Sequence, residues 1–350
     1  MSQATFLNSV LQIAATRKLN PYEQDWSFGV ERQLGPKTIL NLDYVGNKAT
    51  HLNIRTELNQ PTPCNATTGC NPDSSANQSA AGKQSRRPYP NLGLMVYEGW
   101  NGYSNYNALN IKLQRRAKDV TLLAAYAWSK MMDVKSAAAA VSGDAFGAYG
   151  PQNSQCIPCD YARSSYDVGQ RFVASFLYNL PFGQGQQFGG NATGPMNALV
   201  GGWQFNGIAT VQGGFPFTIT ASDHAFVNEA YALRANVVPG VSSVGFHQSI
   251  HQWFNTAAFA QPPDGYFGDS PRNALRSPGV ANLDLSFFKN IQFERLGIQF
   301  RFESFNALNH PEFGFPNPSV NAGPGTYGAI TSINTHYPQR QNQAALRLTF

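Results

Sequence analysis

The stretch Gln341-Asn342-Gln343-Ala344-Ala345-Leu346-Arg347-Leu348-Thr349-Phe350 alternates in hydrophobicity up to the last residue of the sequence. Every second residue from Ala344 to Phe350 is apolar, whereas the residues between them are mainly polar. Successive side chains of a β-strand point to opposite faces, so this strand has one apolar face. An uncovered terminal strand endangers a soluble protein, but a transmembrane barrel uses such a strand for closure. The stretch predicts an all-β fold, a transmembrane antiparallel β-barrel.

Composition agrees with that fold class. The 350 residues are 13% charged, about half of the roughly 25% of ordinary globular proteins. The 13% aromatics, 32 glycines and 22 prolines indicate many strands and turns. No run of about 18 apolar residues exists, which excludes a spanning helix. The net charge of +5 is dispersed, so we expect no nucleic-acid partner.

Alternating segments recur along the chain, with short and long connections between them. Nine such segments have about the 9–11 residues that a tilted membrane strand needs: 25–34, 37–46, 104–116, 120–130, 168–180, 202–213, 281–293, 296–307 and 341–350. Short turns are expected at Gly35, Lys118 and Glu294, with 181–201 as an intermediate connection. The long, polar connections cover 48–103, 131–167, 221–280 and 308–340. This sorting is typical of a barrel with periplasmic turns and long extracellular loops.

Two sets of side chains fit that arrangement. Aromatics near strand ends suit interfacial belts: Trp26, Tyr44, Trp128, Tyr178 and Trp203. Charged residues on the polar strand faces would line the lumen: Lys112, Arg116, Arg301, Glu303 and Arg347. Alternatively, these charges only pair across the wall. A soluble β-sandwich binding module also has alternating strands, but its exposed faces normally carry more Lys and Glu than these.

The cysteines form two close pairs, Cys64/Cys70 and Cys156/Cys159. The Cys-x-x-Cys spacing of the second pair also occurs in redox motifs and zinc sites, but no βαβ pattern surrounds it. Disulfides within extracellular loops are the favoured interpretation. His247 and His251 have a helical metal-ligand spacing but lie in a predicted loop, so no metal site is expected. No nucleophile–base arrangement is visible, and we predict neither an enzyme nor a cofactor.

Several blocks resemble the barrel region of Oar-like TonB-dependent transporters, a type abundant in Acidobacteria. They include Trp26-Ser27-Phe28-Gly29-Val30-Glu31-Arg32-Gln33-Leu34, Tyr103-Ser104-Asn105-Tyr106-Asn107-Ala108-Leu109, Asp167-Val168-Gly169-Gln170-Arg171-Phe172, Trp253-Phe254-Asn255-Thr256-Ala257-Ala258-Phe259 and Phe305-Asn306-Ala307-Leu308-Asn309-His310. The resemblance implies a barrel of about 22 strands, an N-terminal plug and a TonB box. Leu346, Leu348 and Phe350 also resemble the signal that barrel assembly machinery recognises.

The resemblance and the strand count together predict a truncated, C-terminal barrel portion. Residues 1–24 would be a loop or remnant of the preceding region, without a secretory signal, and 25–350 the barrel segment. The expected location is the outer membrane of a Gram-negative bacterium, with lipid as partner and TonB acting only through a missing plug. The implied function is uptake of an unidentified sugar, peptide or chelate, with no gated uptake in the absence of the plug. The alternative is a small passive or structural barrel, a porin or adhesin, which needs an even strand number.

Overall fold

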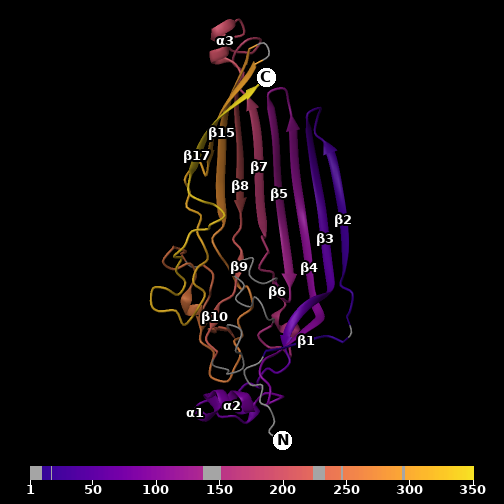
Figure 1. The fold of residues 1–350 in the computed structure, drawn as a ribbon, viewed down its shortest axis with the longest axis vertical. Coiled ribbons are helices and arrows are strands. Elements are labelled where there is room, and N and C mark those ends of the chain that lie inside the picture. Colours follow the sequence, from indigo (N-terminus) through magenta and orange to yellow (C-terminus); the bar gives the residue numbers. More distant parts are fainter. Residues whose placement is uncertain (1–9, 17, 137–150, 224–232, 246, 294–295) are drawn as a thin grey trace.

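The main sheet of the computed structural model spans almost the whole chain. The structure describes residues 10–16, 18–136, 151–223, 233–245, 247–293 and 296–350. Nine antiparallel strands follow one another in chain order across the sheet (Figure 1). They are β2 (Tyr22–Gln33), β3 (Thr38–Glu57), β4 (Met95–Arg116), β5 (Val120–Asp133), β7 (Gln170–Asn179), β8 (Trp203–Gln212), β15 (Val280–Phe293), β16 (Leu296–Phe305) and β17 (Gln341–Thr349).

Shorter elements belong to the connections. β1 (Leu11–Ala14) pairs with β4 in parallel, and β6 (Ala162–Arg163) pairs with the end of β5. Three two-stranded ladders join β9 (Pro216–Phe217) to β14 (Leu275–Arg276), β10 (Thr220–Ala221) to β11 (Leu233–Arg234), and β12 (Asn236–Val237) to β13 (Phe259–Ala260). The helices are η1 (Ala66–Thr68), α1 (Ser75–Gln78), α2 (Ala80–Ser85), η2 (Ile157–Asp160), α3 (Gly194–Val200) and η3 (Thr256–Ala258). Within the described part of the chain, every helix is too short or too polar to cross a membrane.

The nine predicted strands are present, and the all-β fold class is confirmed. The hairpin of β3 and β4 is longer than predicted, so its connection covers 58–94 instead of 48–103. The strands continue past two register shifts around His51, which has a φ of 58°. These irregularities break the period-2 pattern, so alternation alone misses the extension. The turn predicted at Glu294 lies outside the described residues.

The start of the chain also differs from the expectation of a loop over residues 1–24. β2 begins at Tyr22 instead of 25, and β1 forms four residues of strand. β1 pairs in parallel with β4 and joins neither edge of the nine-stranded path. It is therefore not a tenth antiparallel strand of the wall.

Register places apolar side chains in rows across one face of the sheet. One row runs through Leu42, Ile111, Tyr126, Phe172 and Val211 on five adjacent strands. We call this side the apolar face and the other the polar face. Apart from the segment of the β3–β4 hairpin beyond its register shifts, the positions of the nine strands that share the apolar face carry no Asp or Glu. Large apolar side chains of this face are exposed, among them Leu42, Trp128, Phe172 and Val211, and such a surface needs an apolar surrounding.

Connection length divides the two ends of the sheet. The short turns 34–37 and 117–119 lie at one end, together with the α3 connection and the C-terminus (Figure 1). The described parts of the long connections gather at the other end (Figure 1): 58–94, 134–169, 213–279 and 306–340. A barrel with turns on one side of a membrane and loops on the other has this geometry.

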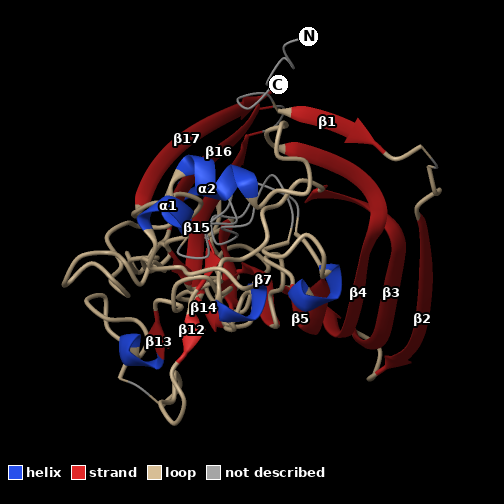
Figure 2. Cartoon of the chain, turned by 90° about the horizontal axis from the view of Figure 1, so that it is seen from below, coloured by secondary structure: helices blue, strands red, loops and turns tan. Residues whose placement is uncertain are grey.

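β2 and β17 are the two edges of the sheet. Among the residues that the structure describes, each pairs with a single neighbour, and they do not pair with each other. Seen end-on in Figure 2, the two strands lie on opposite sides of the molecule. In lipid, unpaired backbone groups along such an edge cost several kcal/mol each. Both edges therefore require partner strands in a membrane.

The two faces should respond differently to the same charge. Ile111→Lys places an ammonium in the middle of the apolar face, and Asn110→Lys places it one residue away on the polar face. We expect the first variant to lose about 2–4 kcal/mol of unfolding free energy in lipid vesicles. Asn110→Lys should change it by less than about 1 kcal/mol, since lumen-facing positions tolerate charge. Equal losses in urea titrations of the two variants would contradict this assignment of the faces.

Candidate ligand-binding site

The long connections pack together into one body at the end of the sheet. We call this body the loop lobe; it comprises the described parts of 58–94, 134–169, 213–279 and 306–340. Its hydrophobic core is drawn from the third and fourth connections. The ring centroids of Phe217 and Phe254 are 5.9 Å apart, and those of Phe217 and Phe315 are 6.3 Å apart. Among the described residues, both clusters of buried hydrophobic side chains therefore lie in the lobe.

Arg272 fastens the third connection to the end of β5. Its side chain is 2% exposed and forms a salt bridge with Asp133. It also donates to the Asp133 carbonyl oxygen at 2.7 Å, to the Asp160 carbonyl oxygen at 3.1 Å and to the Ser136 hydroxyl at 3.2 Å. A buried guanidinium is stable only when its donors are satisfied in this way. The geometry fixes the lobe directly to a strand of the wall.

A second buried pair joins the third connection to the second connection. Arg234 on β11 forms a salt bridge with Asp160, and both side chains are at most 7% exposed. The other Asp160 carboxylate oxygen accepts from the Gln152 backbone N–H at 2.8 Å. The Gln152 side chain then donates to the Gly268 carbonyl at 2.9 Å and accepts from the Arg234 N–H at 2.9 Å. These charge-assisted bonds give the lobe a defined shape.

The first connection is held by its own buried groups. Arg87 and Glu57 form a salt bridge at 2.6 Å, and each side chain is 1% exposed. Asn59 is fully buried and donates to the carbonyls of Tyr89, Leu92 and Gly93 at 2.9–3.1 Å. This amide replaces the backbone ladder that ends with β3, so the turn after the strand remains ordered.

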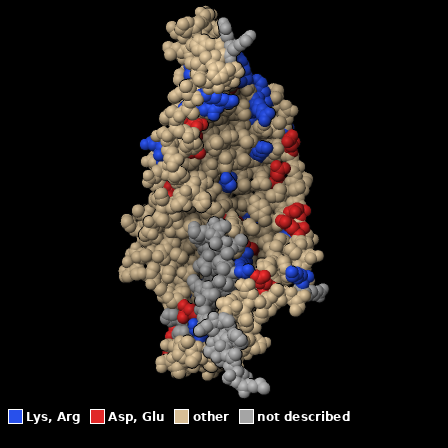
Figure 3. Space-filling view, in the orientation of Figure 1, with Lys and Arg blue, Asp and Glu red and all other residues tan. Residues whose placement is uncertain are grey.

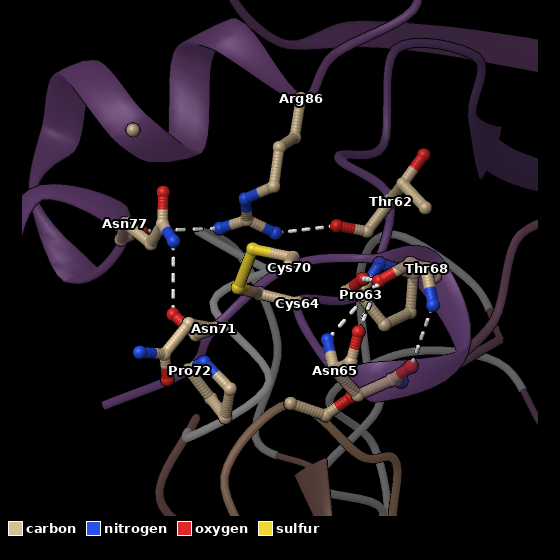
Figure 4. The surroundings of a disulfide bond; sticks show 12 residues. Thr62, Pro63, Cys64, Asn65, Thr68, Cys70, Asn71, Pro72, Asn77 and Arg86 are labelled. Atoms are coloured by element: carbon tan, nitrogen blue, oxygen red, sulfur yellow. Dashed lines mark hydrogen bonds between the residues drawn. A yellow bond between two sulfur atoms is a disulfide. The ribbon is translucent and has the colours of Figure 1, made fainter. Parts of the chain in front are cut away.

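Both cysteine pairs are disulfides within the lobe. Cys64 bonds to Cys70 and Cys156 bonds to Cys159. Around the first, Asn65 caps η1 by accepting from the Thr68 N–H at 3.1 Å (Figure 4). Asn65 also donates to the Gly265 carbonyl at 2.8 Å, which ties the first connection to the third. Gly265 has a φ of 82°, and a Cβ there would lie 1.6 Å from the Cys64 carbonyl oxygen, so only glycine fits.

The five predicted lumen charges all lie on the polar face, in two groups that four strands separate. Figure 3 shows Lys and Arg gathered toward the short-turn end of this face. Lys112 and Arg116 lie on β4, Arg301 and Glu303 on β16, and Arg347 on β17. Among the described residues, none of the five has a salt-bridge partner. Whether they line a lumen or pair across the wall stays open.

Among the described residues, hollows open on the polar face, and two of them lie beside acidic groups. One of 570 Å³ lies near the lobe end beside Glu23, Asp25 and Asn47, and the Asn47 amide donates to Asp25 at 2.6 Å. The other, of 360 Å³, lies further along the sheet beside Asp284 and Glu303. The acidic groups at the lobe end and the basic groups at the turn end give this face an uneven charge. Such a surface can attract and orient a polar solute.

The five predicted belt aromatics all lie on the apolar face, at two levels. Trp26, Tyr44 and Trp128 lie toward the lobe end, whereas Tyr178 and Trp203 lie at the short-turn end. Trp128 is 61% exposed on this face. Trp203 instead stacks beneath the Lys289 ammonium, 5.0 Å from its ring centroid. Their role as interfacial belts stays a prediction.

Sequence patterns did not reveal the buried polar network of the lobe. Its partners are far apart in the chain, and no local spacing marks an Arg that will be buried.

Burial raises the pKa of the Tyr327 hydroxyl at the edge of the lobe core, and lowers the pKa of Arg86 near the first disulfide. In the part of the chain that the structure describes, no group of three or more His, Cys, Asp or Glu side chains could hold a metal ion.

The sheet and its two faces define the class of protein. They are those of a transmembrane β-barrel wall that carries a folded loop lobe at one end. A family model described as "Outer membrane beta barrel domain" matches residues 2–343. The chain belongs to this family and is a protein of the outer membrane of Gram-negative bacteria. No curated protein is similar enough in sequence to be counted as its relative.

Solved outer-membrane proteins are similar to this chain at low sequence identity. The outer membrane transporter YddB from Escherichia coli aligns over 99% of this chain and 34% of its own, with 9% identity and a TM-score of 0.48. The FrpB iron transporter from Neisseria meningitidis aligns over 96% and 32%, with 10% identity and a TM-score of 0.39. The ferripyoverdine receptor of Pseudomonas aeruginosa aligns over 94% and 27%, with 10% identity and a TM-score of 0.41. The chain spans about a third of the length of these proteins.

Breaking the Arg272–Asp133 pair should loosen the lobe and leave the sheet intact. Arg272→Ala leaves a buried carboxylate without its partner, which costs about 3–5 kcal/mol. The matched control is Arg55→Ala, because its pair with Glu98 is 40% and 34% exposed and is worth about 0–1 kcal/mol. Hydrogen exchange in 213–279 should accelerate in Arg272→Ala alone. Unchanged protection there would show that this clamp does not hold the lobe.

Proposed function

We propose that this chain forms the wall of a TonB-dependent uptake receptor whose loop lobe makes the first contact with substrate. The observation that carries the proposal is the sheet of nine strands with both edges free, since a stable barrel requires further strands. The blocks that resemble Oar-like transporters support the same assignment, because that type has a barrel of about 22 strands. In this proposal a plug inside the complete barrel connects it to TonB.

The lobe suits the role of a receptor surface. Its connections are joined by buried ion pairs, a common core and the Asn65–Gly265 bond. A preorganised surface loses less conformational entropy on binding than free loops do. The charged polar face would then provide the path along which a polar solute moves inward. The substrate class, whether sugar, peptide or chelate, stays open.

The C-terminal strand has a role of its own in this proposal, in the assembly of the barrel. Leu346 and Leu348 lie on the apolar face of the edge strand β17, and Phe350 is 94% exposed. An accessible terminal aromatic next to an unpaired edge suits recognition by the barrel assembly machinery. Outer-membrane lipid would then surround the apolar face.

The proposal is tested in outer membranes of the source bacterium. Antibodies against residues 251–275 detect the native product, and photo-crosslinking detects TonB. We expect a heat-modifiable species far above the 38.2 kDa of this chain, crosslinked to TonB in energised cells. Energy-depleted cells serve as the control and should give less crosslinking. A 38.2 kDa species without a TonB crosslink would contradict the proposal and favour the passive barrel, a porin or adhesin.

A further inference from the structure

A large hollow lies on the apolar face where the sheet meets the loop lobe. Its volume is 860 Å³, and its walls come from β3, β4, β5, β7 and β8 together with residues of the lobe. Tyr126, Trp128, Phe172 and Val211 supply an apolar floor. These side chains belong to the face that contacts lipid, so the hollow is outside the lumen. It is distinct from the two hollows on the polar face.

Four cationic residues line this hollow; Arg171 lies on the polar face by its register, and the other three border the hollow on its lobe side. Lys130 is exposed on the apolar face of β5, two residues beyond Trp128. Arg163 on β6 lies opposite Met132 and so projects from the same face. Arg276 on β14 completes the group. Along the strands, the cationic rim therefore follows the aromatic floor in the direction of the lobe.

A buried carboxylate fixes two of these cations. Asp167 is 0% exposed at its side chain, accepts from Arg163 at 3.1 Å and forms a second salt bridge with Arg276. Its other oxygen accepts from the Met131 N–H at 2.7 Å. Arg276 also donates to the carbonyls of Asp167 and Gly214 at 2.9 and 2.8 Å. The formal charge of Lys130, Arg163, Arg276 and Asp167 together is +2, and Arg163 remains 44% exposed.

We propose that this hollow binds a phosphorylated glycolipid of the outer leaflet, with an acyl chain on the aromatic floor and a phosphate at Lys130 and Arg163. Charge complementarity favours this occupant. The rim is cationic, and the strand residues around the hollow place no acid on the apolar face. Arg and Lys are the usual partners of phosphate. A soluble phosphate would use the rim but leave the apolar floor exposed to water.

The level at which the hollow would lie in the membrane fits this occupant. Trp and Tyr side chains prefer the level of the lipid headgroups, and Trp128 and Tyr44 both border the hollow. Lys and Arg just beyond that level meet phosphates, not acyl chains. The inference rests on the outer-membrane location and on the lobe facing outward. It does not depend on uptake or on TonB.

Native mass spectrometry of the receptor purified from outer membranes in mild detergent tests the site. The probes are phosphorylated lipid A, the same lipid without its phosphates, and inorganic phosphate. The test variant combines Lys130→Gln with Arg163→Gln, which leaves the Arg276–Asp167 pair in place. The control is Lys48→Gln, a like loss of charge at an exposed residue of the apolar face that does not border the hollow.

We expect the test variant to bind phosphorylated lipid A about tenfold more weakly, and the control to bind like the wild type. The wild type should also prefer the phosphorylated lipid by about tenfold. Equal binding of the two lipids, or an equal loss in Lys48→Gln, would overturn the proposal. Inorganic phosphate that binds as tightly as the lipid would contradict the glycolipid as occupant. None of these outcomes depends on TonB crosslinking, so the two proposals fail separately.

Discussion

Backbone hydrogen bonding in lipid is the constraint on which this structure depends. A strand in the hydrocarbon region has no water to satisfy its N–H and C=O groups, so each strand must pair on both sides. This requirement explains the long antiparallel ladders and the short turns at one end. It also makes the free edges of β2 and β17 the most informative feature of the sheet. The lipid surrounding allows the apolar face to carry large, exposed side chains.

Two different sets of forces stabilise the two parts of the chain. The sheet relies on its ladders and on lipid, whereas the lobe has an aromatic core and buried ion pairs. Asp133 belongs to both, because it ends β5 and holds Arg272 of the lobe. Asp167 has a related position between the end of β5 and the Arg163–Arg276 pair. The junction between sheet and lobe is therefore polar inside and cationic outside.

Local alternation was enough to predict the strands, because a lipid-facing wall needs the period-2 pattern in every one of them. It failed where His51 interrupts the register of the β3–β4 hairpin. The lobe could not be predicted, since Arg272 and Asp133 are 139 residues apart and Asn65 and Gly265 are 200 apart. Polar, glycine-rich loops of this kind look solvent-exposed in the sequence. Their burial depends on contacts that only the fold brings together.

Single-cysteine labelling on intact cells tests the central claim most directly, because all four native cysteines are in disulfides. Val244→Cys lies in the lobe at a residue that is 75% exposed, and Lys118→Cys lies in the turn between β4 and β5. With a membrane-impermeant maleimide, the account predicts labelling at 244 in intact cells and at 118 only after the outer membrane is permeabilised. Labelling at 118 but not at 244 in intact cells would contradict it.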